Sequence, residues 1–286
     1  MKRRLFTSLV VLSLFSAMVV PISASAAPAR GGSTQTPLGI DISWPQCGKK
    51  LPSDPAFVVV GVNGGLATTT NQCLASQLSY AHAKATGKIT SQPKVQLYVN
   101  TANPGGMGLP SWPSNNVDPA GNLAPNPYLT ACDNSDSLAC AWQYGWNRAV
   151  EDVINRFQPA AVIARVDNVP GNYIWWLDVE TENTWKMGGT AFDYTSNVAV
   201  LEGMAAYFKS RDFKYGLYST GSQWNQIVGN AVSSTSNLNG LPNWRPGGTN
   251  LTTAKDACQA APLTVNGQVV LTQFISRGLD YNYSCI

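Results

Sequence analysis

The 286-residue chain carries 19 basic and 16 acidic residues, a formal net charge of +3, and only 12% of its residues are charged. Three of the basic residues, Lys2, Arg3 and Arg4, lie in an amino-terminal segment that we predict to be removed, which leaves 16 positive charges against 16 negative ones. This balance argues against nucleic acid or an anionic membrane surface as the main partner. Outside that segment no continuous apolar run of about 20 residues occurs, so we predict no membrane span.

The chain begins with the pattern of an export signal. The basic residues precede an apolar run from Leu9 to Val20 and the small-residue site Ala24-Ser25-Ala26, which predicts a signal peptide over residues 1–26. Whether export follows the general or the twin-arginine route stays open. A polar, disordered leader over 27–37 is expected next, followed by one folded domain over 38–286. The predicted location is extracellular or associated with the cell envelope.

Strand-like and helix-like segments alternate along this domain. Apolar and β-branched runs predict strands over 39–43, 57–62, 94–100, 173–181, 214–219, 241–244, 269–275 and 279–283. Helical spacing of apolar residues predicts helices over 73–86, 141–157, 196–211 and 222–228. A long insertion rich in Pro, Gly and Asn, at about 101–140, is expected to be an irregular binding element or lid. The alternation is typical of an α/β fold, and we predict a single-domain, modified TIM-like (β/α) barrel braced by disulfides.

Two acids end the segment 173–181, which otherwise has the apolar density of a strand buried on both faces. On a strand, Asp178 and Glu180 would project from the same face, about 6–7 Å apart along it. The two acids can be the solvated end of the strand. We favour a general acid with a partner carboxylate, because paired carboxyls beside Trp175 and Trp176 are in surroundings that separate pKa values for chemistry.

Further acids, amides and aromatic residues fall at the ends of other predicted strands or in the loops that follow them. In a (β/α) barrel these ends meet in the active site. Flat apolar faces of sugars lie on aromatic rings, while amides and acids bind hydroxyl groups, so we predict a sugar site. The predicted catalytic residues are Glu180, Asp178, Asp41 and Asp280. The predicted substrate-binding residues are Trp44, Asn63, Tyr98, Asn100, Trp185, Tyr218, Trp224 and Gln273.

The six cysteines all follow the predicted signal peptide, and an even number in an exported chain predicts disulfides. We expect the pairs Cys47–Cys73, Cys132–Cys140 and Cys258–Cys285, since each would brace neighbouring segments, although the sequence leaves other connectivities open. No Cys-x-x-Cys is present, and the single histidine, His82, lies in a helical pattern. We therefore predict no metal and no cofactor, and the chain lacks the residues for a Ser-His-Asp or Cys-His hydrolase.

Five motifs carry a family resemblance. They are Gly39-Ile-Asp-Ile-Ser43, Trp176-Leu-Asp-Val-Glu180, Tyr215-Gly-Leu-Tyr-Ser-Thr220, Leu271-Thr-Gln-Phe274 and Leu279-Asp-Tyr-Asn282. In this order, over residues 38–286, the chain resembles the glycoside hydrolase family 25 lysozymes and the actinobacterial glycoside-hydrolase-like barrels related to them. The resemblance implies a modified β/α barrel that cleaves the β-1,4 bond between N-acetylmuramic acid and N-acetylglucosamine in peptidoglycan. It implies that Glu180 is the general acid and Asp178 its nucleophilic or acetamido-orienting partner, with Asp41 and Asp280 completing an acidic mouth.

Two strand ends depart from the family pattern. Gly61-Val-Asn-Gly-Gly65 stands in place of a Lys-x-Thr-Glu-Gly-like end, and Tyr98-Val-Asn-Thr101 in place of Tyr-His-Phe. Together with the insertion, these differences indicate altered subsites. The sequence thus predicts a secreted, monomeric, muramidase-like glycosidase whose partner is a cell-wall polysaccharide. A different wall glycan, and a non-catalytic glycan-binding or envelope-associated barrel, stay open.

Overall fold

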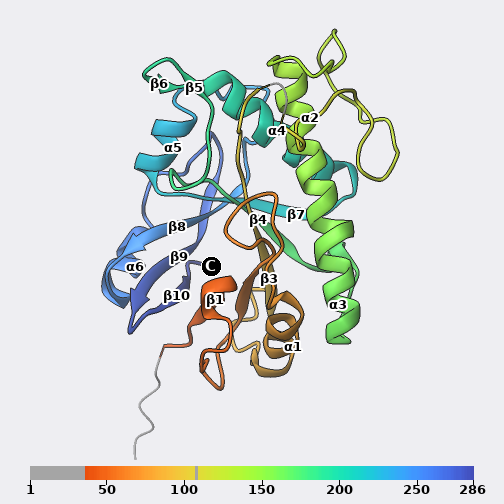
Figure 1. Cartoon of the computed structure of the whole chain (residues 1–286). Coiled ribbons are helices and arrows are strands. Elements are labelled where there is room, and N and C mark those ends of the chain that lie inside the picture. Colours follow the sequence, from red (N-terminus) through yellow and green to blue (C-terminus); the bar gives the residue numbers. More distant parts are fainter. Residues whose placement is uncertain (1–35, 107–108) are drawn as a thin grey trace, which may run out of the picture. The chain divides into compact units, whose positions relative to one another are not determined.

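The centre of the fold is a closed β-barrel. In this computed structural model, which describes residues 36–106 and 109–286, eight strands form the barrel in the order β1-β10-β9-β8-β7-β4-β3-β2 (Figure 1). They are β1 (Gly39–Ile42), β2 (Val58–Gly61), β3 (Val95–Asn100), β4 (Ile174–Asp178), β7 (Lys214–Tyr218), β8 (Pro242–Gly248), β9 (Gln268–Ser276) and β10 (Leu279–Ser284). Neighbouring strands are parallel, except that β10 runs antiparallel to both β9 and β1. The predicted modified barrel is confirmed, whereas the predicted signal peptide and most of the predicted leader lie outside the described residues.

The barrel interior is filled by aromatic rings that glycines on flanking strands accommodate. Tyr98 and Trp176 are register partners on β3 and β4, and they lie between Gly61 of β2 and Gly216 of β7. A Cβ atom added at Gly61 would overlap the Tyr98 ring, and one added at Gly216 would overlap the Trp176 ring. The alternation of large and small residues across neighbouring strands therefore lets the interior pack densely below the rim.

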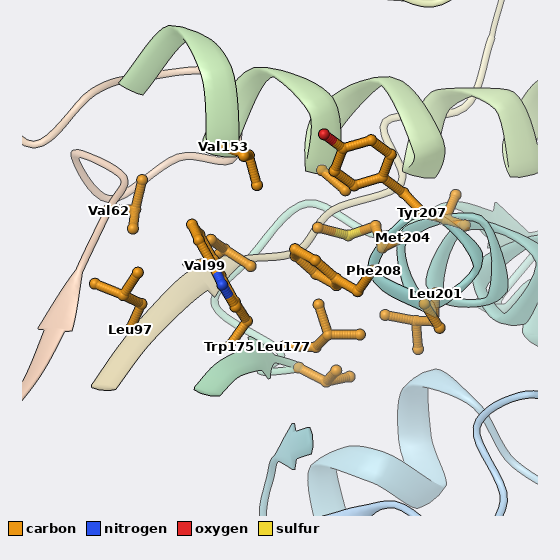
Figure 2. Close-up of a cluster of buried hydrophobic side chains, with 14 of the residues drawn as sticks. Val62, Leu97, Val99, Val153, Trp175, Leu177, Leu201, Met204, Tyr207 and Phe208 are labelled. Atoms are coloured by element: carbon orange, nitrogen blue, oxygen red, sulfur yellow. The ribbon is translucent and has the colours of Figure 1, made fainter. Parts of the chain in front are cut away.

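A second core lies between the barrel and the helices. The helices are α1 (Leu74–Lys84), α2 (Leu138–Glu151), α3 (Gln158–Ala164), α4 (Tyr194–Ser210), α5 (Gly221–Ile227) and α6 (Leu251–Ala257). Trp175 and Leu177 of β4 face outward and belong to the same buried cluster as Met204 and Phe208 of α4 (Figure 2). Because successive residues of β4 point into the two different cores, the whole strand is apolar, as its sequence predicted.

Helices α2 and α4 cross at a point where neither has a side chain. A Cβ atom added at Gly145 of α2 would overlap the backbone oxygen of Val200, and one added at Gly203 of α4 would overlap that of Trp142. Both obstacles are backbone atoms, which cannot turn aside as a flexible side chain can. The close approach of these helices therefore depends on the two glycines.

The predicted helix end at residue 157 was wrong. Helix α2 passes into a π-helical segment (Asp152–Phe157) and then into α3, which ends at Ala164. Pro159 follows two residues after this predicted end, and a proline usually stops a helix because it lacks an N–H and disfavours a helical residue before it. The π-helical turn accommodates the proline, because the Gln158 N–H donates to the oxygen of Val153 across this wider turn. Pro159 then lies in the first turn of α3, where proline is tolerated.

Several other elements differ from the prediction. Strand β8 runs to Gly248 rather than residue 244, with register shifts against β9 that accommodate its proline and glycines. Helix α6 and the small hairpin of β5 (Met187–Gly188) and β6 (Ala191–Phe192) were missed, since both are too short for a periodic signal. Strand β4 ends at Asp178, so Glu180 lies just beyond it rather than on it.

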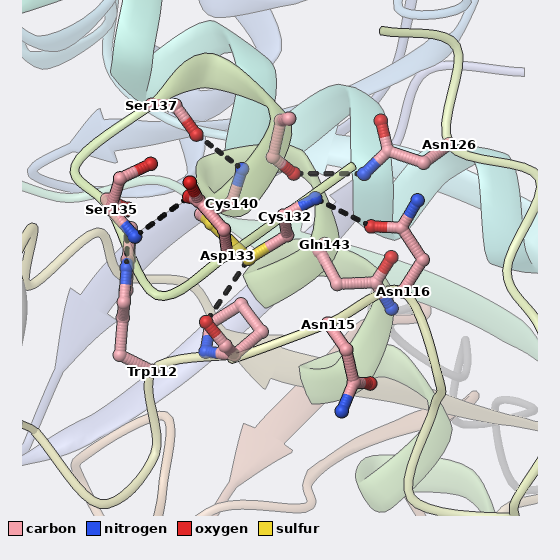
Figure 3. The surroundings of a disulfide bond; sticks show 12 residues. Trp112, Asn115, Asn116, Asn126, Cys132, Asp133, Ser135, Ser137, Cys140 and Gln143 are labelled. Carbon is pink, nitrogen blue, oxygen red and sulfur yellow. Dashed lines mark hydrogen bonds between the residues drawn. A yellow bond between two sulfur atoms is a disulfide. The ribbon is translucent and has the colours of Figure 1, made fainter. Parts of the chain in front are cut away.

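The long insertion is fastened to α2. The Cys132–Cys140 disulfide joins the end of the loop to the helix, and the Trp112 Nε1–H donates to the oxygen of Ser135 at 3.0 Å (Figure 3). Asn126 Nδ2 donates to the oxygen of Ala139, in the first turn of α2, at 2.8 Å. The loop is therefore held in one position on the helix rather than left free to swing.

The structure contains the three disulfides that we expected. Besides Cys132–Cys140, they are Cys47–Cys73 and Cys258–Cys285. Such bonds persist in oxidising surroundings, which is consistent with a secreted protein. Within the described part of the chain, no helix has both the length and the apolar character needed to cross a membrane.

Candidate active site

A cavity of about 600 Å³ opens at the carboxyl-terminal ends of the parallel strands. Because β10 is antiparallel, it begins at this rim and brings Asp280 to the same place as the ends of its neighbours. The cavity collects all four predicted catalytic acids and five of the eight predicted substrate-binding residues. They are Asp41, Asp178, Glu180, Asp280, Trp44, Tyr98, Asn100, Tyr218 and Gln273.

Asp178 and Glu180 reach the cavity from β4 and from the turn after it. Asp178 is the last residue of the strand and lies in register between Asn100 of β3 and Tyr218 of β7. The Val179 N–H still donates to the oxygen of Tyr218 at 2.9 Å, which extends the ladder one residue further. Glu180 therefore stands at the rim directly above Asp178, and both side chains line the cavity.

The two carboxyls are close enough to share a proton. Burial raises the pKa of Asp178 well above its ordinary value, and the neighbouring charge and side chain of Glu180 raise it further. Burial and the charge of Glu182 raise the pKa of Glu180, while its hydrogen bond with Asp178 lowers it. Asp178 Oδ1 is buried and has no hydrogen-bond partner among the described residues. The more deeply buried Asp178 therefore favours its protonated form more strongly than Glu180 does.

Asp41 and Asp280 form a second pair across β1 and β10, where they are direct register partners. Burial and the charge of Asp280 raise the pKa of Asp41 to about 8, although Gln273 and Asn282 each donate to Asp41 Oδ2, at 3.0 and 2.7 Å. Burial also raises the pKa of Asp280. Like charges placed opposite each other on antiparallel strands repel, so a proton on Asp41 relieves the pair.

We expect the stability of the fold to decline as pH rises from about 4 to 8. The pKa of Asp41 is 3.8 in the unfolded chain and about 8 in the folded protein. Between these values the folded protein keeps the proton while the unfolded chain releases it, so the free energy of unfolding falls as pH rises. Urea unfolding at pH 5 and pH 8 measures the effect in the wild type and in Asp41→Asn, which cannot ionise. A pH dependence that is the same in both proteins would rule out this role for Asp41.

Aromatic residues line the rest of the cavity. Trp44 is 48% exposed at its mouth, next to Gly65. Deeper in, the rings of Tyr218 and Trp244 are 4.3 Å apart between centroids, and the Tyr218 hydroxyl donates to Gln273 Oε1 at 3.0 Å. The Trp244 Nε1–H is buried without an acceptor in the described part of the chain, so a ligand oxygen could accept from it once the side chains adjust.

Sequence reasoning missed several cavity residues. Trp244 ends a predicted strand, so the rule that selected the other strand ends would also have found it. Glu182 continues the alternation of Asp178 and Glu180 by one more step, and it accepts a hydrogen bond from Gln223 Nε2 at 2.9 Å. Nothing in the local sequence marks Gln223 itself, because helix α5 brings it to the cavity.

Three predicted binding residues lie behind the cavity rather than in its wall. Asn63 accepts from the Asn100 N–H at 2.8 Å, and its own Nδ2 donates to Asp152 at 2.8 Å. The Trp185 Nε1–H donates to the backbone oxygen of Glu180 at 2.8 Å. Trp224 is buried in the core between barrel and helices. Asn63 and Trp185 thus hold the backbone of two cavity residues in place.

The fold and the site together define a (β/α)-type barrel with paired carboxyls in a polar, aromatic-lined cavity. Residues 156–244 match the family model described as Lysozyme-like protein 1, which supports a lysozyme-like family for this chain without distinguishing glycoside hydrolase family 25. The matched stretch contains Asp178 and Glu180 but neither Asp41 nor Asp280. Searches of curated proteins and of solved structures found no match. Among the described residues, no three His, Cys, Asp or Glu side chains are arranged to hold a metal ion.

Proposed function

We propose that the protein is a secreted glycosidase that cleaves a β-1,4 bond in cell-wall glycan, as a muramidase does. The observation that carries this proposal is the pair Asp178 and Glu180, whose carboxyls line a cavity large enough for sugar rings and both have raised pKa values. Glycoside cleavage needs one protonated carboxyl for the leaving oxygen and one ionised carboxyl for the positive charge that develops on the sugar.

The pair can supply both roles from a single proton. Glu180 is nearer the mouth of the cavity and contacts the glycosidic oxygen first. A bound sugar removes water from around the Glu180 carboxyl and raises the pKa of Glu180 further. The proton then moves along the hydrogen bond from Asp178 to Glu180, which leaves Asp178 ionised below the sugar. Glu180 donates the proton to the leaving oxygen as the glycosidic bond breaks, and the Asp178 carboxylate stabilises the oxocarbenium-like transition state or bonds to the anomeric carbon. A water molecule that gives its proton to Glu180 then adds to that carbon, which completes the hydrolysis and restores the proton of the pair.

The experiment that tests this function incubates the refolded mature protein with purified peptidoglycan and with a panel of other wall polysaccharides. Borohydride reduction of the products labels each new reducing end and identifies the sugar that carries it. Muramic acid at the new ends is the expected result. If no glycan is cleaved while binding to one of them persists, the hydrolase proposal is wrong and the chain is a glycan-binding barrel.

Replacement of Trp44 by alanine is expected to weaken glycan binding by about 3- to 10-fold, because an exposed ring at the mouth provides a stacking surface worth about 0.5–1.5 kcal/mol. Titration calorimetry with a soluble wall fragment measures the change. Leu129→Ala removes an even more exposed apolar side chain that does not line the cavity, and it should bind as the wild type does. Equal losses in the two variants would show that Trp44 does not contact the glycan.

A further inference from the structure

A second cleft of about 470 Å³ lies between the insertion and α2, and it shares no lining residue with the active-site cavity. We call it the loop cleft. Hydroxyl and amide side chains from the insertion and from the loop after β2 form its walls, and α2 forms its floor. The residues on which the argument rests are Thr68, Ser111, Ser114, Asn115, Asn147 and Arg148.

The floor of the loop cleft has donors without acceptors. Arg148 is 5% exposed, and its Nε–H is buried and has no acceptor among the residues that the structure describes. Asn147, which also lines the loop cleft, is 8% exposed, and its Oδ1 accepts from Gln143 Nε2 at 2.8 Å, which leaves its Nδ2 amide as the donor for a ligand. Such donors gain a partner when a ligand brings an oxygen into the cleft.

The charges around the floor already cancel. Glu151 accepts from Arg148 at 2.6 Å and from Arg156 at 3.1 Å, and Asp152 pairs with Arg156 at 2.7 Å. Asp118, in the wall of the loop cleft, is the remaining lining acid, and it accepts from backbone N–H groups of its own loop. No positive charge is left over to attract an anion, so the donors suit neutral acceptors such as sugar hydroxyls and acetamido oxygens.

The loop cleft is rigid before any ligand arrives. Three prolines, at positions 110, 113 and 119, line it and fix the backbone of the insertion. The bond from Trp112 to Ser135 joins two parts of the insertion, and the Cys132–Cys140 disulfide joins its end to α2 (Figure 3). A ligand therefore does not have to order this loop when it binds, which favours its use as a recognition surface.

The loop cleft and the active-site cavity are neighbours along one short loop. Gly65 lines the cavity and Thr68 lines the loop cleft. Three residues of extended chain span at most about 11 Å, so the two sites lie within reach of one glycan strand. We propose that the loop cleft binds a neutral, N-acetylated stretch of the same glycan strand that enters the cavity. The choice of ligand rests on the proposed function, whereas the existence of the second site does not.

The test measures binding of an N-acetylglucosamine hexamer by calorimetry, in the Glu180→Gln protein so that the ligand stays intact. Asn147→Asp keeps the acceptor that Gln143 uses but replaces the free donor with a carboxylate, and we expect it to weaken binding about tenfold. Asn155→Asp, an exposed change on the same helical segment, is the matched control and should leave the affinity unchanged. Ser114→Trp, which fills the loop cleft from its exposed wall, should produce the same loss as Asn147→Asp.

The outcomes separate the two proposals. If the hexamer binds equally well to all these variants, the loop cleft is not a glycan site, whatever the cavity does. If a free stem peptide of peptidoglycan binds there and the hexamer does not, the assignment to glycan is overturned. If Asn147→Asp weakens binding although the wild-type protein cleaves no wall glycan, the second site stands and the hydrolase proposal falls.

Discussion

Replacing Glu180 with glutamine is expected to slow glycan cleavage by about 10²–10⁴-fold, because the amide keeps the shape of the side chain but has no proton to give to the leaving oxygen. The measurement is the rate of reducing-end release from the glycan that the wild type cleaves best. Affinity for that glycan should change little, since glutamine keeps the polar contacts of the side chain.

Asp178→Asn separates the two members of the pair. Asparagine cannot ionise, so the variant lacks the negative charge that Asp178 carries when the proton is on Glu180; the loss of this like charge lowers the pKa of Glu180, and the remaining activity should shift to lower pH. The pH–rate profile of each variant measures this shift. Asp256→Asn, an exposed change on α6, is the matched control and should keep the wild-type profile. Wild-type rates in both Glu180→Gln and Asp178→Asn would show that the pair is not the catalytic centre.

Gly203→Ala is expected to lower the free energy of unfolding by about 2–4 kcal/mol. The added methyl group meets the backbone oxygen of Trp142, so α2 and α4 must move apart, and the gain of about 1 kcal/mol from alanine's helix propensity does not offset this loss. Urea unfolding and the thermal midpoint measure the change, which corresponds to roughly 4–16 °C in a domain of this size.

Gly188→Ala is the control for this substitution. A Cβ atom at Gly188 would lie 3.7 Å from its nearest neighbours, which is ordinary contact, and the change should stay within about 0.5 kcal/mol. Equal stability of the Gly203→Ala, Gly188→Ala and wild-type proteins would mean that the two helices do not approach as closely as described. Rates of glycan cleavage should be unaffected at temperatures where all three proteins are folded, because neither glycine lines the cavity.

The barrel and most of its strands could be predicted from the sequence because local signals and the global fold agree. Strand β4 shows why: Trp175 and Trp176 serve different cores, so an unbroken apolar run is what its position demands. Strand β8 shows the opposite case. Pro246 and the glycines around it give the second half of this strand a sequence that is not typical of a strand. Its pairing with β9 comes from barrel closure rather than from local preference.

The site was predictable where strand ends determine it and unpredictable where packing does. The strand-end rule selected Asp41, Asp178 and Asp280, which the structure brings to one cavity. The same rule cannot tell whether a side chain points into the barrel mouth or behind it. Asn63 satisfied the pattern as well as the acids did, yet tertiary contacts turned it toward the protein.

The active-site cavity depends on the last two strands, β9 and β10, which close the barrel and carry the side chains that donate to Asp41. The two side chains that donate to Asp41 come from positions 232 and 241 residues further along the chain. Contacts of such long range carry a large loop-closure entropy and slow the folding of the domains that depend on them. A growing chain that has not yet delivered β9 and β10 therefore has an open sheet in place of a barrel, with Asp41 unpartnered. The carboxyl cluster thus cannot be complete before β10 has paired with β1 and β9 has paired with β10.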